Sequence, residues 1–152
     1  MDNLYGFYQA TTKIRTLLSA EPNCKTVTYG DIFRVDLNKQ TIFPLSHVIV
    51  NQVTKENNVM RFNFTIIAMD IVNISKSATT DAFRGNDNEQ DILHTQLALL
   101  DRVTQILKNE EGAEYVLDGN PTFEPFTERF ENNLAGWACT FDILVPNQMT
   151  KC

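Results

Sequence analysis

The sequence has little of what marks a secreted, membrane-spanning or disulfide-rich protein. Its three cysteines, Cys24, Cys139 and Cys152, are odd in number and widely separated, which argues against a disulfide framework and favours reduced thiols. No apolar run approaches the roughly 20 residues of a membrane span. Lys13 and Arg15 interrupt the N-terminal stretch in which a signal peptide would lie. These absences predict a protein made in a cytoplasm-like compartment, with no membrane contact.

Positive charge is also scarce. Thirteen Lys and Arg residues stand against nineteen Asp and Glu residues, so the formal net charge is −6, and the basic residues form no cluster along the chain. Binding to a nucleic-acid backbone requires several cations on one surface, because they must neutralise phosphates. The composition therefore argues against nucleic-acid binding as the main activity.

Apolar residues, by contrast, are plentiful enough for a core. The chain has 152 residues, of which 43% are hydrophobic. A domain of this length buries roughly 68–70% of the surface that its unfolded chain exposes. We therefore expect one domain over residues 1–152, stable without metal or disulfides.

Two segments have the spacing of amphipathic helices. In the first, about residues 4–18, apolar side chains recur at three- and four-residue steps. In the second, about residues 88–108, Asp87 as N-cap and Gln90 three residues later resemble a capping box, and Lys108 followed by Gly112 marks the end. The apolar stripe of this second helix is expected to comprise Ile92, Leu93, Leu97, Leu100, Val103, Ile106 and Leu107.

The remaining segments have the pattern of strands. Alternation and β-branched residues predict strands within about residues 26–74, followed by a polar loop over about residues 75–88. The Asp118–Pro121 segment predicts a turn, after which residues 122–145 form a β-hairpin connected by Asn132–Gly136. Pro125 indicates an edge or bulged strand. The order of elements predicts an α+β fold, in which an antiparallel β-sheet carries two helices packed on one face.

Residues that commonly carry chemistry are few and scattered. His47 and His94 have no ligand-type residue at metal-binding spacing, and the acidic stretch at 81–91 lacks the ligand register of an EF-hand. Nucleotide-binding, serine-hydrolase and zinc-protease motifs are absent. Asp70 interrupts an apolar strand; it is structural if an arginine or backbone donor pairs with it, and a perturbed carboxylate otherwise. The sequence predicts a protein that is not an enzyme, with no catalytic residue, metal or cofactor.

Two connections contain candidates for contact with another protein. Phe83 and Arg84 lie in an otherwise polar loop, and aromatic residues and arginine are enriched at the energetic centres of interfaces. We expect this loop and the turn at residues 132–136 to contact neighbouring subunits. The candidate interface residues are Phe83, Arg84, Asn86, Asp87, Asn132 and Asn133.

Three stretches together resemble virion structural proteins of tailed bacteriophages. They are residues 36–51 (DLNKQTIFPLSHVIVN), residues 85–91 (GNDNEQD) ahead of the long helix, and residues 124–131 (EPFTERFE) followed by 134–137 (LAGW) and 140–147 (TFDILVPN). The resemblance covers most of the chain from about Val27 onward and is strongest to proteins of marine and crAss-like gut phages. The order of helices and strands is also similar to the tail-terminator and tail-completion fold.

This resemblance implies a structural subunit of a phage neck or tail, with no active site. Such a tail terminator, tail-completion protein or ring adaptor assembles in the bacterial host cytoplasm as a homo-oligomeric ring, sixfold or twelvefold. In the virion it joins neighbouring portal, neck and tail ring proteins through heterologous contacts. An acidic subunit lets DNA pass without specific binding, because like charges repel. The alternatives are a small intracellular phage-encoded enzyme, with a polar pocket around Asp70 and His47, and a host-directed binding module absent from virions.

Overall fold

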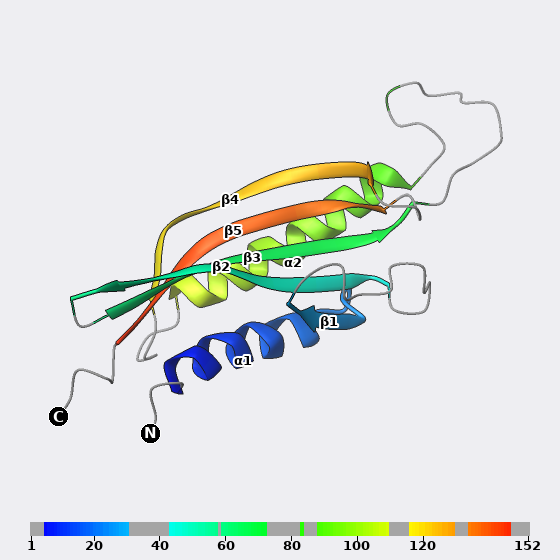
Figure 1. Cartoon of the computed structure of the whole chain (residues 1–152). Coiled ribbons are helices and arrows are strands. Elements are labelled where there is room, and N and C mark those ends of the chain that lie inside the picture. The colour runs from blue at the N-terminus through cyan, green and yellow to red at the C-terminus, as the bar shows by residue number, and fades with distance from the viewer. Residues whose placement is uncertain are drawn as a thin grey trace.

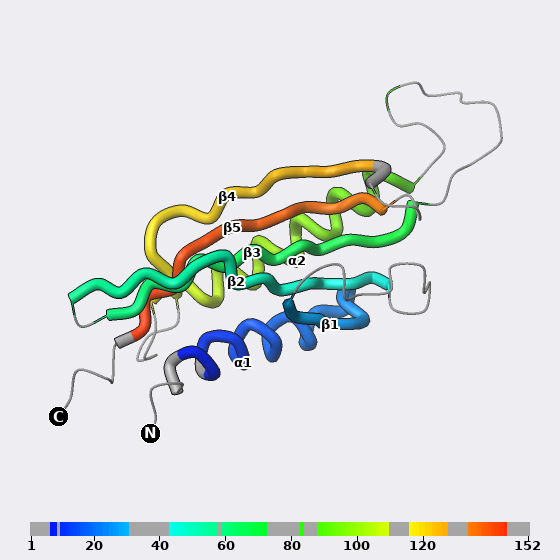
Figure 2. Tube along the Cα trace, in the orientation of Figure 1, coloured from blue at the N-terminus to red at the C-terminus, as the bar shows by residue number. Residues whose placement is uncertain are grey.

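The computed structural model describes residues 5–30, 43–57, 59–72, 83, 88–109, 116–129 and 134–146. Along these ranges lie α1 (Tyr5–Ser19), β1 (Thr26–Tyr29), β2 (Leu45–Glu56), β3 (Val59–Ile71), α2 (Glu89–Asn109), β4 (Val116–Arg129) and β5 (Leu134–Pro146). The strands form one five-stranded sheet in the order β1-β2-β3-β5-β4, with β1 and β4 at its edges (Figure 2). The α+β class predicted from the sequence is confirmed.

The sheet is mixed, because its first strand runs parallel to the second. β2, β3, β5 and β4 are antiparallel neighbours, as predicted, whereas β1 pairs with β2 in parallel from Thr26↔Leu45 onward. The N–H groups of Lys25 and Thr26 both donate to Pro44 O, at 2.8 and 3.2 Å, so the two strands begin side by side. Side chains alternate in the same way in either direction, and the sequence pattern of β1 therefore carries no information on its direction.

Both helices cover the same face of the sheet. Alternate residues of β3, among them Phe62, Phe64 and Ile66, pack in one cluster with buried residues of α1 and α2. Figure 1 shows α2 lying behind the strands. Trp137 of β5 fixes α2 against the sheet, since its indole Nε1 donates to Leu93 O at 2.8 Å. The layered arrangement expected from the sequence is therefore present.

The start and the buried stripe of α2 differ from the prediction. Asn88 O accepts the first helical hydrogen bond, from the N–H of Ile92 at 3.0 Å, so Asn88 takes the N-cap position expected for Asp87. Gln90 Nε2 donates to Phe83 O at 2.8 Å, and Asp87, the predicted partner of Gln90 in a capping box, lies outside the described residues. Ile106, expected in the stripe, is 43% exposed. The buried residues of α2 are Ile92, Gln96, Leu99, Leu100, Val103, Thr104 and Leu107.

β4 is one bent strand at the place where a turn was predicted. Asp118 pairs with Asp142 and Thr122 with Thr140, so four steps along β4 match two steps along β5. Gly119 has a φ of 74°, a left-handed conformation that glycine adopts without steric cost. The prediction of a turn was wrong, because these turn-forming residues make a bulge within an edge strand and do not end it.

β5 also begins earlier than predicted. Its first residue is Leu134, so Leu134, Ala135 and Gly136 belong to the strand and not to the connection assigned to residues 132–136. Gly136 pairs with Met69 of β3 on one side and with Phe126 of β4 on the other. The edge position that Pro125 indicated for its strand is confirmed.

Candidate interaction surfaces

Of the interface residues predicted from the sequence, the structure describes only Phe83. Its side chain is 79% exposed, and its carbonyl oxygen accepts the hydrogen bond from Gln90 in the first turn of α2. The exposed ring is thereby placed near the start of this helix. The other predicted interface residues lie outside the described part of the chain: Arg84, Asn86, Asp87, Asn132 and Asn133.

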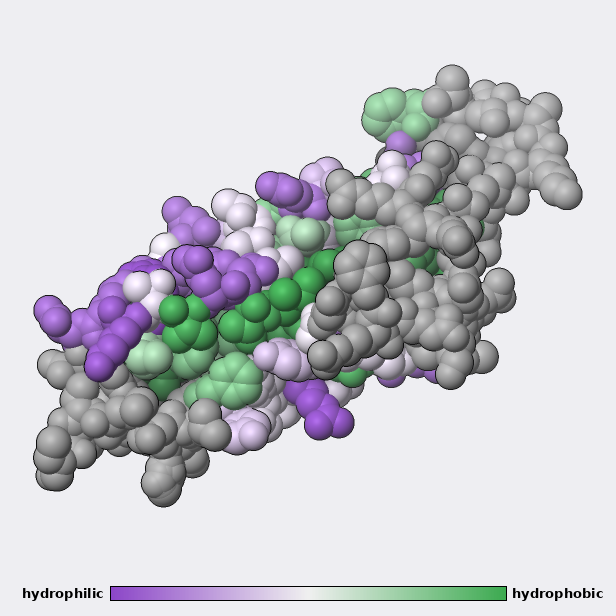
Figure 3. Space-filling view, in the orientation of Figure 1, coloured by the Kyte–Doolittle hydropathy of each residue, from purple (hydrophilic) through white to green (hydrophobic). Residues whose placement is uncertain are grey.

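A surface that sequence reasoning missed lies on the face of the sheet opposite the helices. Because side chains alternate along a strand, the residues of β3 between the core phenylalanines point to this opposite face. There they join side chains of three other strands in a continuous network of hydrogen bonds, which we call the polar ladder. Figure 3 shows hydrophilic residues gathered over these strands. The polar ladder consists of Asn51, Glu56, Arg61, Asn63, Thr65, Asp118, Thr140 and Asp142.

Arg61 holds the charged end of the polar ladder together. Its Nε lies 2.6 Å from Glu56 Oε2, and its Nη1 lies 2.7 Å from Asp118 Oδ2 and 3.1 Å from Asp142 Oδ2. The hydrogen bonds to Glu56 and then to Asp118 raise the pKa of the Arg61 guanidinium above its usual range. Three carboxylates against one guanidinium leave this end with a net charge of −2. All four side chains are partly exposed, so the surface is defined by its geometry and charge more than by any large gain in stability.

Amides and hydroxyls continue the polar ladder across the sheet. Asn51 Nδ2 donates to Asn63 Oδ1 at 2.8 Å and to Thr65 Oγ1 at 2.7 Å. Asn63 Nδ2 donates to Asp142 Oδ1 at 2.7 Å, and the hydroxyls of Thr65 and Thr140 lie 3.1 Å apart. Such cross-strand pairs fix the register of neighbouring strands. The result is an ordered, acidic, polar surface on one part of this face, whereas the other part is an apolar cluster of Phe43, Leu45, Met69, Phe126 and Leu134.

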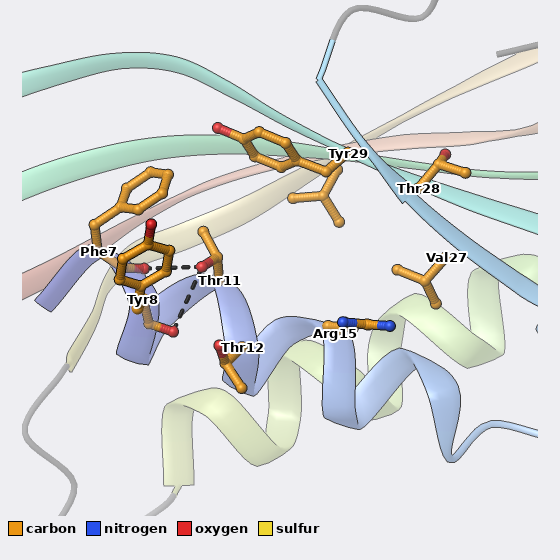
Figure 4. Close-up of a pocket in the computed structure, with 9 residues that line it drawn as sticks. Phe7, Tyr8, Thr11, Thr12, Arg15, Val27, Thr28 and Tyr29 are labelled. Carbon is orange, nitrogen blue, oxygen red and sulfur yellow. Dashed lines mark hydrogen bonds between the residues drawn. The ribbon is translucent and has the colours of Figure 1, made fainter. Parts of the chain in front are cut away.

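A third surface is a groove between α1 and β1, with a cavity volume of about 590 Å³. The ring of Phe7 at its base lies 6.0 Å from that of Phe62 and 6.4 Å from that of Tyr29. Figure 4 shows the side chains of α1 facing those of β1 across the groove. The sequence pattern did not reveal it, because the apolar residues of α1 fit a core-facing stripe equally well. The groove is lined by Phe7, Tyr8, Thr11, Thr12, Arg15, Val27, Thr28, Tyr29 and Val48.

His47 and Asp70, the polar pair of the enzyme alternative, do not share a site. His47 is fully buried, with Nε2 2.7 Å from Gly30 O and Nδ1 2.6 Å from the Thr28 hydroxyl. A carbonyl oxygen only accepts, so Nε2 carries a proton and donates to Gly30 O. Asp70 is two residues from Ala68 and therefore points to the helix-covered face, whereas His47 pairs with Ile67 and points to the other.

Asp70 has a backbone donor and an unfavourable environment. Its Oδ1 accepts from the N–H of Ile71 at 2.8 Å, while partial burial raises the pKa of its carboxyl above the ordinary value of 3.8. The sequence left a structural and a perturbed role open for Asp70. The condition for the structural role is met, because a backbone N–H donates to its carboxylate. The raised pKa means that the folded chain holds this proton at pH values where the unfolded chain has released it.

Asp70→Asn is therefore expected to stabilise the protein at neutral pH. Because the folded-state pKa is raised, stability falls as pH rises from the ordinary pKa of 3.8 through the raised one, and the whole penalty is present at neutral pH. Asparagine keeps an oxygen for the N–H of Ile71 but carries no charge. Thermal unfolding should show a higher Tm for the variant at neutral pH and no gain below pH 3.8. The same gain at both pH values would contradict this explanation.

The described cysteines are poorly suited to nucleophilic or ligand roles. Cys24 and Cys139 are buried and free. Burial raises the pKa of the Cys139 thiol to about 12 and also raises that of Cys24, so both are protonated at neutral pH, and the thiolate is the reactive form. In the described ranges, no three histidine, cysteine or acidic side chains gather as metal ligands.

The comparisons with known proteins assign this chain to no family. No protein-family model matches the chain, and no curated protein matches it. None of the helices in the described ranges has the length and apolarity needed to cross a membrane. The functional proposal therefore depends on the three surfaces and on the resemblance of the sequence stretches.

Proposed function

We propose that this chain is a ring-forming structural subunit of a tailed-phage neck or tail, namely a tail terminator, a tail-completion protein or a ring adaptor. The observation that carries the proposal is the polar ladder: both helices cover one face of the sheet, and part of the other face is an ordered, acidic surface. In the proposed ring this surface faces the DNA channel. The resemblance of three sequence stretches to virion proteins supplies the phage context.

The charge arrangement of the polar ladder suits a DNA conduit. A phosphate backbone is attracted by exposed cations with free donors and repelled by carboxylates. Arg61 is the only cation of the polar ladder, and its Nε and Nη1 are already engaged by Glu56, Asp118 and Asp142. A sixfold or twelvefold ring repeats this acidic surface around its axis. DNA would then pass without a site that holds it.

Subunit contacts are proposed to involve the segment around Phe83. The ring of Phe83 is 79% exposed, and an aromatic side chain available at the surface is typical of an interface anchor. Neighbouring ring proteins above and below would be contacted in the same way. The channel surface and the contact surface are thus separate, and each can be changed without the other.

Replacing both Phe83 and Arg84 by alanine tests the contact surface. In cells infected by a phage whose own copy carries a stop codon, the wild-type chain should restore the titre. The double variant should lower it by about tenfold or more, since loss of an interface anchor costs roughly 2 kcal/mol per contact. The Tm of the purified variant should be unchanged, because the exposed ring of Phe83 contributes little to stability.

A matched control replaces one apolar residue and one cation elsewhere on the surface. Ile106 and Lys108 are both exposed on α2, away from Phe83. Their double alanine variant should restore the titre fully. Normal titre and complete particles with the Phe83 and Arg84 variant would overturn the proposed contact.

A further inference from the structure

The groove between α1 and β1 is open to solvent and has the size of a small-molecule site. Its volume is about 590 Å³, and ligand-binding pockets commonly enclose about 300–1,000 Å³. Tyr8 on one side and Tyr29 on the other are 60% and 53% exposed, and Thr12 and Arg15 are exposed as well. A ligand of moderate size can therefore reach the lining residues from solvent.

The groove is elongated, and its two ends differ in chemistry. Tyr8 and Arg15 lie seven residues apart on α1, which corresponds to about 10 Å along the helix axis. On β1, alternation directs Val27 and Tyr29 to the side of α1, where Tyr29 meets the ring of Phe7. Figure 4 shows the three aromatic rings together at one end and Arg15 beside Val27 at the other. An occupant that touches both ends must be long, and a compact aromatic acid would reach only one of them.

The walls between the two ends are mainly apolar. Val27 packs against the main core cluster, and Val48 is buried within it. The hydroxyls of Thr11 and Thr28 are already hydrogen-bonded inside the protein, that of Thr11 to a carbonyl of α1 and that of Thr28 to a histidine ring. The middle of the groove thus offers an occupant apolar contact and few polar partners.

Arg15 is the one charged residue among the nine that line the groove. In the described part of the chain its guanidinium has no hydrogen-bond or ion-pair partner, and α1 contains no Asp or Glu. Glu21, the first acidic residue after α1, is paired with Arg102 of α2. The positive charge at this end of the groove is therefore available to an anion, in a chain whose net charge is −6.

We propose that the groove binds a straight-chain carboxylate, that is, a fatty acid of medium length. The carboxylate lies against Arg15, and the hydrocarbon chain runs along α1 to the rings of Phe7 and Tyr29. Burial of the hydrocarbon chain supplies most of the affinity, and the single cation determines which end of the ligand lies where. This inference goes beyond the ring assignment and does not depend on it, since the groove is distinct from the polar ladder.

Isothermal titration calorimetry tests the site with decanoate as the probe, below the concentration at which it forms micelles. Decanoate should bind about tenfold or more tightly than hexanoate, because four additional methylene groups are removed from water. It should also bind about tenfold more tightly than decyltrimethylammonium, which has the same alkyl chain but a cationic end group. The negative net charge of the protein favours the cation elsewhere on its surface, so this preference indicates a locally positive site.

Two pairs of variants locate the binding. Arg15→Gln should lower the affinity for decanoate about fourfold, since an exposed ion pair contributes modestly, whereas Lys108→Gln makes the same change of charge on α2 and should have no effect. Thr11→Trp fills the middle of the groove and should abolish binding. Its control is Thr95→Trp on α2, because Thr95 is also partly exposed and also bonds a carbonyl of its own helix. The Tm of each variant shows whether it is folded; if Thr11→Trp is not, the Arg15 and Lys108 variants decide.

Three results would overturn the proposal. The first is no binding of decanoate at millimolar concentration. The second is equal affinity of the wild-type chain for decanoate and decyltrimethylammonium, or an Arg15→Gln variant that binds decanoate as the wild type does. The third is binding that a folded Thr11→Trp variant retains, because the ligand would then occupy another site.

Discussion

Replacing Gly136 by alanine is expected to cost about 3 kcal/mol or more of the free energy of unfolding. Gly136 lies opposite Met69 in the pairing of β5 with β3. A Cβ added there would lie 1.9 Å from Ala68 O and 2.8 Å from Met69 Cα. Backbone atoms of a central strand cannot move away from the added methyl group as a flexible side chain could. β3 and β5 would therefore separate locally and lose backbone hydrogen bonds.

Urea-induced unfolding measures this loss, and Gly119→Ala is its control. Gly119 has a φ of 74°, but no atom lies within 4 Å of an added Cβ. Its substitution should therefore cost only about 1 kcal/mol, the conformational penalty of a left-handed alanine. Equal losses at the two glycines would contradict the close approach of β3 and β5 at Gly136.

Reversing the charge of Asp118 in the polar ladder and of Glu124 beside it is expected to lower phage titre by about 100-fold or more. Asp118→Lys and Glu124→Lys change two exposed side chains of β4 that point to the face opposite the helices. In a ring of six or twelve subunits the added cations would face DNA together, and affinity for DNA rises steeply with the number of phosphates that are neutralised. DNA would then be retained in the channel.

The controls separate charge from position. Asp118→Asn with Glu124→Gln removes the carboxylates without adding cations, and its effect on titre should be smaller than that of the lysines. Asp91→Lys with Asp101→Lys changes the net charge as much but on the exposed surface of α2, and it should leave the titre unchanged. Equal loss of titre from the α2 and β4 reversals would contradict a DNA channel lined by the polar ladder.

The helices and the long strands were predictable from local pattern. The alternation of Phe62, Phe64 and Ile66 with Arg61, Asn63 and Thr65 indicated one apolar and one polar face in the first half of β3, and the structure has both. The partners of the polar face were not predictable, because they depend on register. Arg61 binds Asp118, which is 57 residues away in the sequence, and Asp142, which is 81 residues away. No local sequence pattern predicts contacts between residues so far apart.

Glycines and short strands account for the errors. Gly119 and Gly136 were both assigned to connections, yet Gly119 makes a bulge in β4 and Gly136 permits close backbone approach in β5. Glycine is equally suited to turns, bulges and close backbone approaches, so its presence in the sequence does not predict which of the three forms. The parallel direction of β1 was missed because four residues carry no directional pattern. The predicted interface residues other than Phe83 lie outside the described part of the chain and remain predictions.

Quantitative mass spectrometry of gradient-purified virions tests the central claim most directly. The measurement compares the amount of this chain with that of the major capsid protein in particles of the phage that encodes it. A structural ring subunit is expected at a low, fixed copy number near a small multiple of six. Absence from purified virions, with the chain present in the infected cells, would contradict the proposed role and favour an intracellular enzyme or a host-directed binding module.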